Sequence, residues 1–354
     1  MKRLFLVIFG LVMSLPSWTQ PCLPNGITFN TQSQIDSFHA NFPNCTEIEG
    51  YVVINGINIT NLYGLNAITS IGGELAIVIN DSLTTLGGLE NLVSVGATLT
   101  IFNNPVLHSL TGLEKLNSVG GSLVVYMNDI LPNLIGLDSL KDVGGEIQIH
   151  TSNTLISLNG LKSLTSIGGD LGLWDNPLLS NLNALEGLTS VKGSINLINN
   201  NSLTSLKGLD NVKADSIHSL YITSNSILSA CAIKCICDYL AIPNMLIEIL
   251  DNATGCNSEE EVDTACMALS VDYNTSQDLF SIYPNPVSTN VTIESAKTQP
   301  GIYISIINLQ GINMIKCSIR DKKTILDVNN LPRGVYLVKI ISLSSTNNYK
   351  LVKN

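Results

Sequence analysis

The chain has 354 residues, of which 45% are hydrophobic and 13% are charged, so it can bury a large core in two or three domains. Its 28 acidic and 18 basic side chains give a formal net charge of -10. Nucleic-acid binding needs a basic surface, and no basic run follows the first residues. The charge therefore excludes a nucleic-acid-binding protein.

Residues 1–20 have the pattern of a targeting segment. Lys2 and Arg3 precede an apolar run from Leu4 to Leu15, which small residues follow. A charged start, a short apolar middle and a small-residue end are typical of a secretory signal peptide. The alternative is a membrane anchor, but about a dozen apolar residues are too few to cross a bilayer. We expect a signal peptide and no transmembrane segment.

Residues 21–49 predict a helical cap. Cys22 and Cys45 flank a short amphipathic segment, in which Thr31 is a suitable N-cap. Cysteines of exported chains form disulfides, so we expect Cys22 to pair with Cys45 and to close the first turn. The apolar side of the predicted helix consists of Ile35, Phe38 and Phe42.

Residues 50–228 repeat with a period of 24. A fixed period of this length predicts a solenoid, in which each turn of chain stacks on the one before. One column holds glycine in every turn but one, where Ala184 replaces it, and two further columns hold leucine. The glycines are Gly64, Gly88, Gly112, Gly136, Gly160 and Gly208; the leucines are Leu83, Leu107, Leu131, Leu155, Leu179 and Leu203, and Leu86, Leu110, Leu134, Leu158, Leu182 and Leu206.

Each turn contains one alternating segment, such as Leu99–Phe102, which predicts a strand with one buried face. The rest of the turn is too short for a full helix, so we expect turns or a second short strand. An asparagine recurs near each strand end, with Ser152 as the exception, and stacked asparagines can bond the open backbone groups of the next turn. They are Asn80, Asn104, Asn128, Asn176 and Asn200.

Strand alternation also predicts a candidate binding site. Inward positions such as Leu99 and Ile101 are apolar in every turn, whereas the outward positions vary. Four consecutive rungs about 4.8 Å apart would carry a ring each, in a strip roughly 15 Å long. The strip is either a binding surface for a glycan or a protein, or a ladder that only stabilises the strands. The outward column is Val78, Phe102, Tyr126, His150, Trp174 and Ile198.

Residues 229–270 are rich in cysteine and predict a second cap. Four of the five cysteines should form two disulfides, with Cys235 unpaired, and the sequence leaves the pairing open. A metal site that uses Cys235 and Cys237 is the alternative, although no histidine lies nearby. The five are Cys231, Cys235, Cys237, Cys256 and Cys266.

Beyond a polar linker at 271–279, residues 280–354 contain several short alternating strands, which predict a small antiparallel β-sandwich of Ig-like type. Cys317 within it is expected to be a buried small hydrophobe rather than a reactive thiol.

Two segments resemble known families. CTEIEGYVVI at 45–54, with the repeated GL..L.SVGG.L.I rows, resembles the receptor L domain, over about residues 22–268. This resemblance implies a right-handed, leucine-rich-repeat-like β-solenoid, although the strict period departs from that family. YPNP, LPRGVYLVKI and the terminal KLVK resemble the type A sorting domain of the type IX secretion system. That resemblance implies export, and attachment at the cell surface, through the type IX machinery.

No catalytic constellation or cofactor motif is found. The four histidines have no Ser, Asp or Cys partner at a recognisable spacing. We therefore expect a mainly β, non-enzymatic adhesion or binding protein without cofactor or metal, secreted or held at the outer-membrane surface. The alternatives are a polysaccharide-processing enzyme on a β-helix, which would use a pair of turn carboxylates, or a passive spacer. The candidate acids are Asp81, Asp129, Asp138, Asp170 and Asp175.

Overall fold

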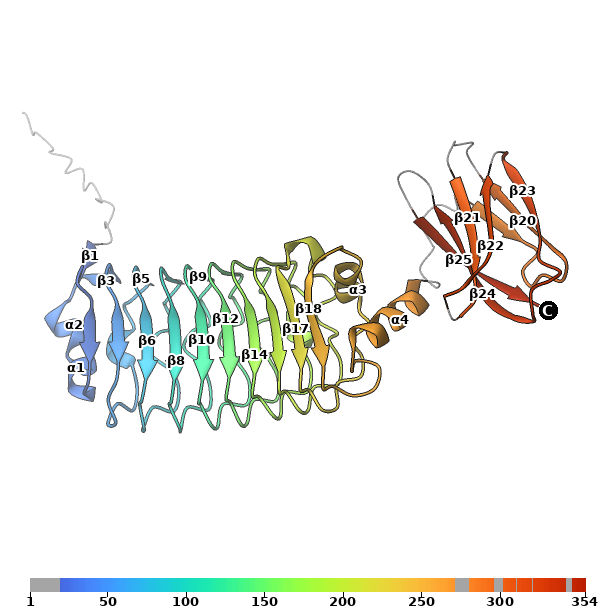
Figure 1. Ribbon diagram of the computed structural model, residues 1–354. Helices are drawn as coiled ribbons and strands as arrows, with labels where there is room; N and C mark the ends of the chain where they lie inside the picture. The colour runs from blue at the N-terminus through green and yellow to red at the C-terminus, as the bar shows by residue number, and fades with distance from the viewer. Residues whose placement is uncertain (1–19, 271–279, 296–301, 310, 320, 342–345) are drawn as a thin grey trace, which may run out of the picture. The chain divides into compact units, whose positions relative to one another are not determined.

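The computed structural model describes residues 20–270, 280–295, 302–309, 311–319, 321–341 and 346–354. It consists mainly of β-strands, and the chain divides into two compact units, which meet in sequence at Glu261 and Val262. The first unit is the predicted parallel β-solenoid, with its turns stacked one after another (Figure 1). The expected linker and, except for Gln20, the expected signal peptide lie outside the described residues.

A ten-stranded parallel sheet forms one face of the solenoid. Its strands pair without slippage through the middle turns, so that Leu99 lies between Leu75 and Leu123. Each inner turn thus has backbone hydrogen bonds to both neighbours, which one turn alone could not supply. In spatial order the strands are β2 (Ile27–Phe29), β4 (Val52–Ile54), β6 (Leu75–Val78), β8 (Leu99–Phe102), β10 (Leu123–Tyr126), β12 (Ile147–His150), β14 (Leu171–Trp174), β16 (Ile195–Ile198), β17 (Ser219–Thr223) and β18 (Leu246–Leu250).

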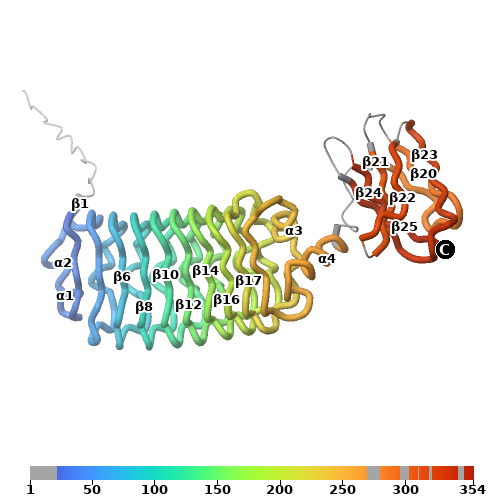
Figure 2. The backbone as a smooth tube through the Cα atoms, in the orientation of Figure 1, coloured from blue at the N-terminus to red at the C-terminus, as the bar shows by residue number. Residues whose placement is uncertain are grey.

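A second parallel sheet has eight short strands, so of the two expected alternatives, turns or a second short strand, the strand is the one present in these turns. The remainder of each turn is irregular coil, with the short 3-10 helices η1 (Tyr63–Leu65), η2 (Asn183–Leu185) and η3 (Ala214–Ser216), and it closes the coil that Figure 2 traces. The strands are β1 (Gln20–Cys22), β3 (Cys45–Ile48), β5 (Ser70–Ile71), β7 (Ser94–Val95), β9 (Ser118–Val119), β11 (Asp142–Val143), β13 (Ser166–Ile167) and β15 (Ser190–Val191).

The leucine columns merge into one continuous core, in which Leu86 and Leu110 are fully buried. The glycine column is required by the backbone. Gly112 has a φ of +117°, and a Cβ there would lie 2.1 Å from the carbonyl oxygen of Leu86. Gly64 and Ala184 occupy the same place in their turns, and there the chain forms the 3-10 helices η1 and η2.

The predicted asparagine ladder is confirmed. Asn104 Oδ1 accepts hydrogen bonds from the backbone N–H of Asn80 at 3.1 Å and from its Nδ2 at 2.9 Å. Asn104 Nδ2 donates in turn to the carbonyl of Ile77 at 3.0 Å, 27 residues earlier. The ladder extends beyond the predicted members, because Asn225 and Asn252 continue it into the C-terminal cap.

The N-terminal cap contains two short helices where one was predicted, α1 (Gln32–Asp36) and α2 (Phe38–Asn41). Thr31 caps α1 as expected, in a reciprocal capping box with Gln34. The break falls at Ser37, whose hydroxyl donates to a carbonyl of the preceding turn. Of the predicted apolar side, Ile35 and Phe38 are buried and Phe42 is half-buried.

The solenoid limits predicted from the repeat, 50 and 228, are too narrow. The N-terminal cap supplies β2, which pairs with β4, and the C-terminal cap supplies β18, which pairs with β17. Both caps therefore add a rung whose sequence lacks the 24-residue pattern. The predicted disulfide between Cys22 and Cys45 is present and ties β1 to β3.

The C-terminal cap adds α3 (Lys234–Leu240) and α4 (Glu259–Ser270). Cys231 pairs with Cys256, and Cys237 and Cys266 are disulfide-bonded as well. Cys235 is the free cysteine, as predicted. Burial, together with the carboxylates of Asp238 and Asp210, raises the pKa of its thiol to about 12, so it remains a neutral packing group. Among the described residues, no three His, Cys, Asp or Glu side chains gather as a metal site.

The second unit contains the predicted antiparallel sandwich. One sheet has β19 (Phe280–Tyr283), β20 (Asn290–Ser295) and β23 (Lys323–Asp327); the other has β22 (Asn313–Ile319), β21 (Ile302–Ile307), β24 (Gly334–Ile341) and β25 (Thr346–Lys353). Buried residues of both sheets, such as Val291 and Val338, form its core. Cys317 is half-buried against this core, and burial raises the pKa of its thiol.

Candidate functional site

The four predicted rings lie on consecutive rungs of the ten-stranded sheet, at the last residue of β8, β10, β12 and β14. The pairing aligns Phe102 with Tyr126, Tyr126 with His150, and His150 with Trp174. All four are half-buried, while the residues before them in each strand are buried. The predicted strip on the outer face is therefore confirmed, and we call these four residues the ring ladder.

The rings stack face to face. Centroids of successive rings are 4.2, 4.7 and 4.6 Å apart, with interplanar angles of 16°, 21° and 11°. Tyr126 and His150 are consequently covered on both faces by their neighbours, and their edges point outward. The sugar-face stacking considered from the sequence needs an open ring face, so these two rings cannot supply it.

Apolar side chains extend the ladder at both ends. Val78 pairs with Phe102, and Ile198, 37% exposed, pairs with Trp174. On the Trp174 strand, the position two residues earlier is glycine, and a Cβ at Gly172 would lie 2.2 Å from an indole carbon. The indole therefore lies over Gly172, which holds it in the stack.

His150 is the titratable member of the ladder. Burial between Tyr126 and Trp174 lowers its pKa below the usual 6.5, and the nearby carboxylate of Asp175 opposes this shift only partly. Its Nδ1 lies 3.1 Å from the hydroxyl of Thr151. Imidazole in this position is a stacking group that is neutral at physiological pH.

Acidification should destabilise the ladder. Because the folded pKa of His150 lies below 6.5, the unfolded chain takes up the proton first as the pH falls, and stability decreases until the folded imidazole is also protonated. Between about pH 7 and about pH 5, the melting temperature of the wild type should fall further than that of His150→Phe. Trp174 is the only tryptophan outside the expected signal peptide, so its fluorescence reports the stack. Equal falls in both proteins would contradict this assignment.

Next to the ladder, the residue after each member of the outward column, from Val78 to Ile198, has a positive φ. Asparagine and aspartate tolerate this conformation, but Ile79 (φ +55°) and Met127 (φ +54°) do not favour it. Their side chains are 39% and 43% exposed beside the ladder. Strain of this kind often lies at functional sites. Neither residue was predicted from the sequence, although two apolar residues in a column that is otherwise polar were a visible signal.

Four of the five candidate acids accept hydrogen bonds from the solenoid itself. Asp170 accepts the backbone N–H of Ser194 at 2.7 Å, and Asp138 accepts that of Gly136 at 3.0 Å. Asp129 and Asp175 each accept an asparagine amide of the next turn. These four carboxylates therefore stabilise the coil.

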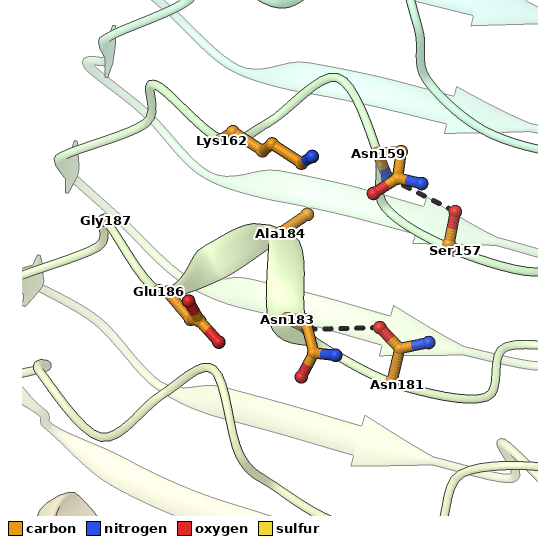
Figure 3. Close-up of a pocket in the computed structure, with 8 residues that line it drawn as sticks. All are labelled: Ser157, Asn159, Lys162, Asn181, Asn183, Ala184, Glu186 and Gly187. Carbon is orange, nitrogen blue, oxygen red and sulfur yellow. Dashed lines mark hydrogen bonds between the residues drawn. The ribbon is translucent and has the colours of Figure 1, made fainter.

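A separate hollow of about 540 Å³ lies on the coil side, between two adjacent turns (Figure 3). Its lining is polar, and includes Asn159 and Lys162 from one turn and Asn183 and Glu186 from the next. This pocket was not predicted from the sequence. The feature that could have drawn attention to it is Ala184, the one residue other than glycine in its column.

Comparison with known protein families assigns the C-terminal part of the chain to one family. Residues 281–354 match the secretion system C-terminal sorting domain, in agreement with the motifs that resemble a type IX sorting domain. This domain directs the protein to a secreted or cell-surface location. Among the described residues, no helix has the length and apolar character needed to cross a membrane. A search of curated proteins finds no match.

Proposed function

We propose that the solenoid is a non-enzymatic binding module displayed outside the cell, and that a protein partner docks on the ring ladder and the residues beside it. The observation that carries this proposal is the ladder itself: four half-buried rings whose edges point outward on one flat face. The repeat pattern of the solenoid resembles the receptor L domain, a ligand-binding module, and this resemblance also supports a binding function.

The chemistry of the ladder favours a protein over a glycan. Glycans stack on open ring faces, and Tyr126 and His150 have none. A protein can instead pack side chains across ring edges and the exposed apolar groups of Ile79, Met127 and Ile198. Aromatic residues at the centre of such a patch commonly supply most of the binding free energy.

Two further features weigh against the alternatives. A passive spacer would gain from asparagine or glycine at the positive-φ positions, since isoleucine there costs roughly 1–2 kcal/mol. The strained side chains at Ile79 and Met127 therefore favour a role at the surface. A polysaccharide-processing enzyme would use a pair of carboxylates, whereas four of the five candidate acids already accept hydrogen bonds, three from the next turn and Asp138 from its own turn.

Photo-crosslinking tests the proposal. A benzophenone amino acid at Met127, in the exported full chain, should form an adduct with a cell-surface component of a neighbouring cell. The adduct should resist glycosidases and be destroyed by protease. Trp174→Ala should lower the adduct yield by about 10-fold or more, because it removes the largest ring of the ladder.

Tyr63→Ala is the matched control. Tyr63 is an aromatic residue 64% exposed in η1, away from the ladder, so its removal should leave the yield unchanged. If the Trp174→Ala protein gives the same adduct yield as the wild type, the ring ladder is not the docking surface. An adduct that glycosidase removes would show a glycan partner instead.

A further inference from the structure

The coil side of the solenoid has a capping contact that four turns share and three turns lack. In four turns, the acidic residue two positions after the column glycine accepts the backbone N–H of that glycine. The donor–acceptor distances are 2.9 Å for Glu90, 3.0 Å for Glu114, 3.0 Å for Asp138 and 3.3 Å for Asp210. These carboxylates are thereby engaged within their own turns.

In the first of the three, Asn66 takes the acidic position and Gly64 lies in η1. The other two turns are adjacent and depart from the pattern in different ways. In one, Lys162 occupies the acidic position, and an ammonium group cannot accept a hydrogen bond from Gly160. In the next, Ala184 replaces the glycine and the backbone forms η2, so Glu186 keeps the acidic position without the contact. The two departures release one carboxylate and introduce one ammonium, side by side.

The hollow of about 540 Å³ lies at these two turns (Figure 3). The side chains of Asn159, Lys162, Asn183 and Glu186 all line it, and their polar atoms make no hydrogen bond to another described residue. The backbone beneath is fixed, because Ser157 accepts the N–H of Asn159 at 3.5 Å and Asn181 accepts that of Asn183 at 3.2 Å. The hollow thus carries four exposed polar side chains whose donors and acceptors are free to bind a ligand.

We propose that this hollow binds a neutral sugar residue of a glycan. Amides, an ammonium and a carboxylate together offer donors and acceptors, and sugar hydroxyls both donate and accept. A ligand with a strong charge of either sign would meet a like charge, from Lys162 or from Glu186. An apolar ligand would leave these polar groups unpaired on binding.

The size and position of the pocket agree with this assignment. Its volume is within the range of small-molecule sites, and its polar lining predicts weak affinity, with a dissociation constant on the order of 1 mM per sugar unit. It lies on the coil side, whereas the ring ladder lies on the ten-stranded sheet. Glycan binding here and protein docking on the ladder are therefore separate, and either can fail alone.

The test uses the ¹⁵N-labelled full chain and four neutral probes: maltotriose, cellotriose, mannotriose and xylotriose. At least one should shift the side-chain amide signals of Asn159, Asn181 and Asn183. Lys162→Glu restores the capping residue of the other turns, so it should keep the melting temperature or raise it. The same change places two carboxylates in the pocket and should weaken binding by about 10-fold or more.

Lys115→Glu is the control, because Lys115 belongs to a regular turn of the coil side and does not line the pocket. It should leave the amide shifts unchanged. Asn183→Ala is a second pocket variant, which should lose binding without altering the backbone of η2. The proposal is overturned if none of the four probes shifts these amides, or if Lys162→Glu and Asn183→Ala bind as the wild type does.

Discussion

Replacement of Asn104 by alanine is expected to lower the free energy of unfolding of the solenoid by about 2 to 6 kcal/mol, since two buried backbone groups lose their partner at roughly 1–3 kcal/mol each. The two groups are the N–H of Asn80 and the carbonyl of Ile77. Asn104 itself is fully buried, so water cannot replace its side chain. Denaturant-induced unfolding followed by circular dichroism measures this loss.

Asn153→Ala is the matched control. Asn153 is exposed and bonds only Asp129 through its side chain, so its loss should change stability by no more than about 0.5 kcal/mol. Ser152→Asn tests the same ladder in the opposite direction, because serine is its one exception. We expect that change to stabilise the protein by about 1 kcal/mol. Equal effects of Asn104→Ala and Asn153→Ala would show that the buried ladder contributes nothing.

Removal of residues 278–354 should abolish surface display and leave the chain in the periplasm. These residues include the matched sorting domain, which has a buried core of its own residues. The solenoid core consists of other residues, so the truncated chain should still fold. Cell fractionation, with protease accessibility of intact cells, measures the distribution.

The reciprocal experiment grafts residues 278–354 onto a periplasmic reporter protein. The graft should carry the reporter outside the cell, while the reporter alone should stay in the periplasm. Normal display of the truncated chain would refute the sorting assignment. Failure of the graft alone would locate part of the export signal in the solenoid.

Features that depend on the spacing of residues along the chain were predictable from the sequence. Strand alternation placed Phe102, Tyr126, His150 and Trp174 on one column, and the structure stacks them there. Cysteine spacing predicted the bond between Cys22 and Cys45. The ring column follows from the 24-residue spacing between turns, and the disulfide from two cysteines that flank the predicted cap helix.

Features outside the repeat were not predictable in the same way. The end strands β2 and β18 belong to segments without the repeat pattern, and only pairing with β4 and β17 makes them rungs. The covered faces of the rings depend on side-chain rotamers, as the position of Trp174 over Gly172 illustrates. The hollow lies between the turn of Lys162 and the 3-10 turn η2, and a residue column does not reveal how the backbones of two turns leave such a space.

The spacing along the asparagine ladder has a consequence for how this protein can change in length. Successive members are 24 residues apart through the middle turns, but 25 and then 27 apart toward the C-terminal end. A whole middle turn can therefore be duplicated or excised as a unit, because the new neighbours meet the same complementary surface on each side. The length of the solenoid would then change by one whole turn at a time, while the N-terminal and C-terminal caps stay intact.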